Sequence, residues 1–102
     1  MDRKAQLTDL KRELENLVAV LREDEGCTWL SHFERCLDKT DQLIESGFEQ
    51  NQLSELSVSV RSVYGGMGSF NDYVPPQSAW GTDRFSNNVW EAAMALKVIG
   101  EY

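Results

Sequence analysis

The stretch LTDLKRELENLVAVL, residues 7–21, predicts the core of a helical fold. Leucines recur along it at spacings of three and four, a period that places them on one face of an amphipathic helix. They are Leu7, Leu10, Leu14, Leu17 and Leu21. The spacing also fits a short heptad seam, but a stripe this short is more often one face of a bundle core than a dimer zipper. The chain must therefore supply further helices that cover these leucines.

Two segments that follow can supply such faces. The segment between Thr28, a candidate N-cap, and Gly47, a stop signal, has an apolar helical face. This face comprises Trp29, Phe33, Cys36, Leu37, Thr40 and Ile44, with Leu43 at its edge. A third stripe comprises Leu53, Leu56, Val60 and Val63. The β-branched run in residues 56–64 leaves a strand open as an alternative, but the period near 3.6 favours a helix.

The last segment begins after an irregular connection of about ten residues, in which Pro75 and Pro76 disfavour helix. Asp83 is the candidate N-cap of a final helix, and Gly100 closes it. The core face of this helix comprises Phe85, Val89, Ala92, Ala93, Leu96 and Ile99, widened by Trp90 and Met94. The sequence therefore predicts a single all-α domain over residues 1–102. We expect a four-helix bundle with an irregular Gly- and Pro-containing connection before the last helix.

The composition limits the possible locations and cofactors. The first residues, MDRKAQLTDLKREL, are charged and periodic, so we expect no signal peptide and a cytoplasmic location. No apolar run approaches the roughly 20 residues that cross a bilayer. Cys27 and Cys36 are nine residues apart, which fits neither a redox pair nor a zinc knuckle, and we expect Cys36 to be a packed thiol. With His32 as the single histidine, we expect no metal and no cofactor.

Negative charge is concentrated in the middle of the chain. The net charge of the whole chain is −7, and residues 23–55 hold nine acids but only two bases. Such a field repels nucleic acid and anionic membrane, and it attracts a basic partner. Four carboxylates fall within about 60° of one another on the second helix, and they are Glu34, Asp38, Asp41 and Glu45. This stripe is either solvated surface or a site that meets a basic protein.

Aromatic residues of the connection are candidates for the same contact. Tyr73 and Trp80 are candidates to bind the partner, and Trp80 stands out because it lies in a loop with no helical stripe to bury it. A few buried aromatic side chains supply most of the affinity in many interfaces. The alternative for Trp80 is that it covers the core of its own chain.

The glycine-rich stretch SVYGGMGSFNDYVPP, residues 62–76, matches no nucleotide or catalytic motif. It lacks the lysine of a P-loop, the third glycine of a dinucleotide fingerprint and the G-x-S-x-G elbow. We interpret it as a rigid corner in which glycines reverse the chain and short polar side chains bond neighbouring amides. The residues of this corner are Gly65, Gly66, Gly68, Ser69, Asn71 and Asp72.

The segment YGGMGSFNDYV resembles the signature of a family of small bacterial proteins, with the specific part spanning Tyr64–Asp72. The resemblance implies that this chain is an immunity protein of a polymorphic toxin system. It identifies no catalytic residues. The resulting hypothesis is a non-enzymatic protein that neutralises a basic toxin domain, acting as a monomer or homodimer. Two alternatives stay open: a small helical enzyme or ligand-binding domain that uses the Gly65–Asp72 turn, and a structural module that self-associates through its first helix.

Overall fold

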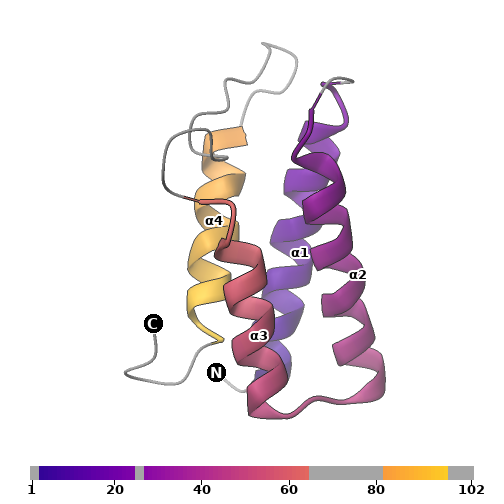
Figure 1. The fold of residues 1–102 in the computed structure, drawn as a ribbon, viewed down its shortest axis with the longest axis vertical. Helices are drawn as coiled ribbons and strands as arrows, with labels where there is room; N and C mark the ends of the chain where they lie inside the picture. The colour runs from indigo at the N-terminus through magenta and orange to yellow at the C-terminus, as the bar shows by residue number, and fades with distance from the viewer. Residues whose placement is uncertain (1–2, 25–26, 65–81, 97–102) are drawn as a thin grey trace.

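The computed structural model describes residues 3–24, 27–64 and 82–96, which form four α-helices (Figure 1). They are α1 (Arg3–Leu21), α2 (Leu30–Ser46), α3 (Gln50–Arg61) and α4 (Thr82–Met94). Helix α1 packs against α2 and α4, and α3 completes the bundle by packing against the same two helices. The predicted all-α four-helix bundle is confirmed. The Gly- and Pro-containing connection lies outside the described residues.

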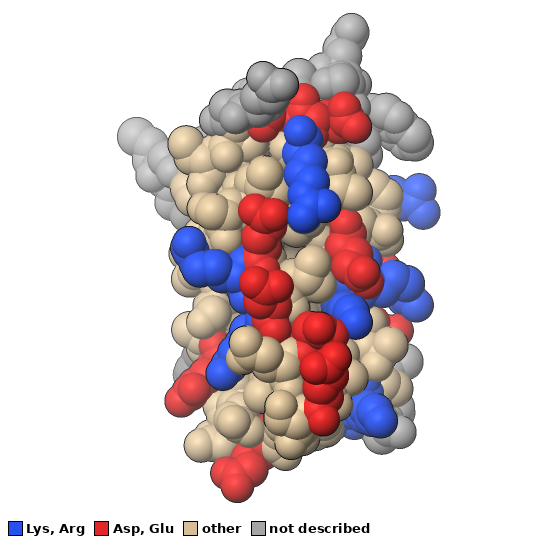
Figure 2. All heavy atoms as spheres, turned by 90° about the vertical axis from the view of Figure 1, so that its right-hand side faces the viewer, with Lys and Arg blue, Asp and Glu red and all other residues tan. Residues whose placement is uncertain are grey.

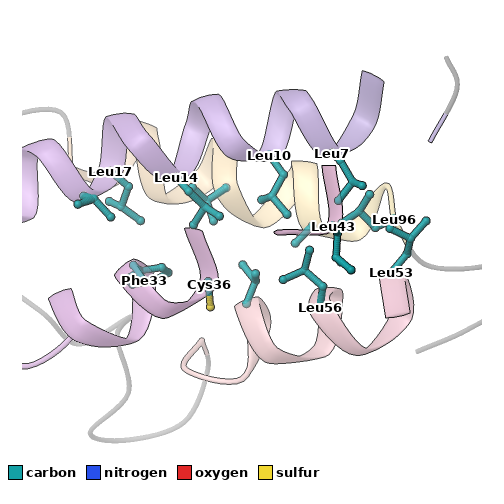
Figure 3. Packing of buried hydrophobic residues seen from close by; sticks show 14 of the residues in the cluster. Leu7, Leu10, Leu14, Leu17, Phe33, Cys36, Leu43, Leu53, Leu56 and Leu96 are labelled. Carbon is teal, nitrogen blue, oxygen red and sulfur yellow. The ribbon is translucent and has the colours of Figure 1, made fainter. Parts of the chain in front are cut away.

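The leucine stripe of α1 lies at the centre of the core (Figure 3). All five leucines of this stripe are completely buried, together with Val18. They pack against Phe33 and Leu43 of α2, Leu53 and Leu56 of α3, and Leu96 after α4. The interpretation of the stripe as a bundle face is therefore confirmed, because these leucines are covered by the other helices of the same chain.

Helix α2 departs from the prediction at its start and in the centre of its face. Trp29, rather than Thr28, is the N-cap residue, and it makes no side-chain cap bond. The backbone of Trp29 is already helical, and its carbonyl accepts the Phe33 N–H as the first hydrogen bond of the helix. Trp29 therefore takes the N-cap position predicted for Thr28. Leu43, predicted at the edge, is in the core. The stop at Gly47 is confirmed by its φ of 92°, which favours glycine.

Helix α3 excludes the strand alternative for the part of residues 56–64 that it covers. It begins with a reciprocal capping box, in which the Glu49 side chain accepts the N–H of Gln52 and the Gln52 side chain accepts the N–H of Glu49. On its inner face the buried Ser57 hydroxyl donates to the Ala93 carbonyl of α4 at 2.7 Å. This polar contact joins the two helices within the core.

Helix α4 begins at Thr82, so Asp83 lies inside the helix and the predicted N-cap is wrong. The helix ends at Met94, earlier than the sequence indicated, but Leu96 is still fully buried beyond its end. The predicted stop at Gly100 and the core position Ile99 lie outside the described residues.

The described helices were compared with the length and hydropathy of a membrane span. Among the described residues, none combines the length and apolar character that crossing a bilayer requires.

Candidate protein-binding face

Helix α2 carries the predicted acidic stripe on its outward side. Its four carboxylates follow one another at spacings of four, three and four residues, which keeps them on one side of the helix. Asp38 and Glu45 are exposed, whereas Glu34 and Asp41 are partly covered. Figure 2 shows acidic side chains gathered along the long axis of this side of the molecule, with basic side chains between them and at the edges.

Two of the four carboxylates are paired with bases, one on α1 and one directly after its end. Lys11 Nζ lies 2.7 Å from Asp41 Oδ1, and Arg22 Nη2 lies 3.1 Å from Glu34 Oε2. Arg22 follows α1 directly, and its N–H bonds the Val18 carbonyl of the last turn. Because eleven residues are about three helical turns, Lys11 and Arg22 lie on the same side. The stripe is thus less negative than the sequence of α2 alone indicates, because Lys11 and Arg22 come from outside α2.

Lys11 is surrounded by carboxylates from both helices. Its pKa is raised by the hydrogen bond and the charge of Asp41, and further by the charges of Glu15 and Glu45. Glu15 lies four residues after Lys11 on α1, and sequence reasoning missed it because it considered α2 alone. The acidic surface therefore extends from α2 onto α1.

We call this surface the acidic face and define it by five carboxylates. They are Glu15, Glu34, Asp38, Asp41 and Glu45. Only Lys11 and Arg22 form ion pairs with these carboxylates among the contacts between described residues. Three carboxylates of the acidic face, Glu15, Asp38 and Glu45, are exposed to solvent and can meet the cationic groups of a partner.

The remaining predicted site residues lie outside the described part of the chain. This applies to both aromatic candidates, Tyr73 and Trp80. It applies equally to the residues of the predicted corner, which are Gly65, Gly66, Gly68, Ser69, Asn71 and Asp72. The acidic face is therefore the part of the predicted site that the structure brings together.

The first residue of the signature, Tyr64, is anchored to α4. Its hydroxyl donates to the Ser86 carbonyl at 3.0 Å, and the Ser86 hydroxyl donates to Tyr64 Oη at 3.3 Å. The Tyr64 ring packs against Trp90, with 5.1 Å between ring centroids, and against the edge of Phe33. Burial raises the pKa of Tyr64 to about 12. Tyr64 is thus a neutral structural residue that fixes where the chain leaves α3.

A thiol and an imidazole lie together on α2, but their environment does not activate the thiol. Cys36 Sγ is 3.6 Å from His32 Nε2. Burial raises the pKa of Cys36 to about 11, so the thiol is protonated at neutral pH, whereas a nucleophilic cysteine needs a lowered pKa. Burial also lowers the pKa of His32. The pair therefore fits packing better than covalent catalysis.

The described residues contain no cluster that fits a metal ion. No three side chains of the types His, Cys, Asp and Glu come together there in an arrangement that could hold one. The acidic face has a lysine ammonium among its carboxylates, which suits contact with a protein better than binding of a bare cation.

Comparison with known proteins places the chain in a family. No curated protein and no solved structure matches it. One family model, described as "Domain of unknown function (DUF6966)", matches residues 22–79. The matched segment contains α2, α3 and the glycine-rich signature, and it covers more than half of the chain. The chain therefore belongs to the DUF6966 family.

Proposed function

We propose that this protein is a non-enzymatic binding protein whose acidic face meets a basic surface of a protein partner. The observation that carries the proposal is the clustering of five carboxylates from α1 and α2, of which two are paired within the chain. Complementary charge of this kind raises association rates toward about 10⁸ M⁻¹ s⁻¹ at low salt. The protein would therefore recognise its partner first through charge.

The two internal ion pairs support this role by fixing the geometry of the acidic face. Lys11 and Arg22 hold the carboxylates of Asp41 and Glu34 in place before any partner arrives. Side chains that are ordered beforehand lose less conformational entropy on binding. Both pairs are partly exposed, so we expect each to contribute no more than about 1 kcal/mol to folding. Their main effect would be on the arrangement of charge.

The partner class follows from the resemblance of residues 64–72. This signature resembles that of small bacterial proteins linked to polymorphic toxin systems, in which small acidic proteins neutralise toxins. A toxin that acts on an anionic substrate presents a basic cleft, and an acidic helix pair can cover it. We therefore propose that the protein is an immunity protein and that it blocks a basic toxin domain.

The proposal places this encounter in the cytoplasm. Cys27 and Cys36 are both free thiols in the bundle. Free thiols persist in the reducing cytoplasm, whereas secreted small domains tend to use cysteines in disulfides. The state of the cysteines is consistent with this location.

The test is a binding and rescue experiment with the product of the adjacent gene. The purified protein should capture that product, and its co-expression should allow cells to survive expression of the product. Lack of capture, together with death of cells that express both proteins, would remove the proposed function. Capture without rescue would support a binding protein but not an immunity protein.

A further inference from the structure

We draw no further inference here: the strongest candidate, a shallow groove of about 230 Å³ between α3 and α4 lined by Val58, Arg61, Ser62 and Trp90, exposes a valine, but nothing in the structure shows what covers it.

Discussion

Replacing Tyr64 with Phe tests the contact that fastens the end of α3 to α4. The variant keeps the ring against Trp90 and Phe33 but loses both hydrogen bonds with Ser86. A neutral hydrogen bond contributes roughly 0.5–1.5 kcal/mol net. The bond from Ser86 is longer, at 3.3 Å, and counts for less. We expect Tyr64→Phe to lower the free energy of unfolding at pH 7 by about 1–2 kcal/mol.

At alkaline pH, Tyr64→Phe should no longer lower the free energy of unfolding. Burial raises the pKa of Tyr64 from 10.0 to about 12, so the folded state holds the phenolic proton more tightly than the unfolded state. Stability is therefore fully present below pH 10 and is lost as the pH rises from 10 toward 12. At pH 11, one unit above the pKa of the unfolded state, this loss amounts to about 1.4 kcal/mol. The Phe variant has no phenolic proton and therefore does not lose this stability.

Urea unfolding, followed by circular dichroism of the helices at pH 7 and pH 11, measures both effects. All other titrating groups are common to the two proteins, so the difference between them isolates Tyr64. We expect the unfolding free energy of the variant to be lower by about 1–2 kcal/mol at pH 7 and nearly equal to that of the unmodified protein at pH 11. A cost that is the same at both pH values would refute the assignment of a buried, hydrogen-bonded Tyr64 hydroxyl.

Three further predictions concern the core and the buried titratable groups. Leu14 is fully buried, so Leu14→Ala should lower the unfolding free energy by about 2–5 kcal/mol in urea, while Thr8→Ala on the exposed side of α1 stays within about 0.5 kcal/mol. Burial lowers the pKa of His32 below 6.5, so its imidazole should titrate in NMR with a midpoint below that value, and stability should fall as the pH drops below 6.5. A midpoint at or above 6.5 would contradict the partial burial of the His32 ring. Burial raises the pKa of Cys36 to about 11, so iodoacetamide at pH 8 should modify the partly exposed Cys27 first, and mass spectrometry should find Cys36 modified only in urea.

The helices were predictable from the sequence because their signal is local. The period of the leucines in residues 7–21 determines which face of α1 is buried, and the glycine at position 47 tolerates the positive φ with which α2 ends. Helix starts were less predictable. Thr28 and Asp83 are good N-cap residues by type, but the backbone at Trp29 and Thr82 is already helical.

The carboxylates of the acidic face on α2 were predictable from the sequence, but their pairing with bases from outside α2 was not. Periodicity places Glu34, Asp38, Asp41 and Glu45 on one side of α2, but it does not say which helix lies beside them. The pairing with Lys11 and Arg22 depends on how α1 packs against α2, and residues 30 and 12 positions apart in sequence meet only in the folded bundle. A helix-by-helix charge count therefore overestimates the free negative charge and misses Glu15.

We propose that the acidic face, and not the overall negative charge of −7, attracts the partner. The double variant Asp38→Lys/Glu45→Lys reverses two exposed charges on this face. A matched control, Glu55→Lys/Glu91→Lys, reverses two exposed charges on α3 and α4 and changes the net charge by the same amount. Both pairs of positions lie on helix surfaces, where such substitutions cost little stability.

The most direct measurement is the association rate of each variant with the protein captured in the binding experiment, by stopped flow at increasing NaCl concentration. We predict that the Asp38/Glu45 variant associates about tenfold or more slowly at low salt and with a flatter salt dependence. The Glu55/Glu91 control should stay close to the unmodified protein. Equal slowing of association in both variants, or no slowing in either, would contradict attraction of the partner by the acidic face.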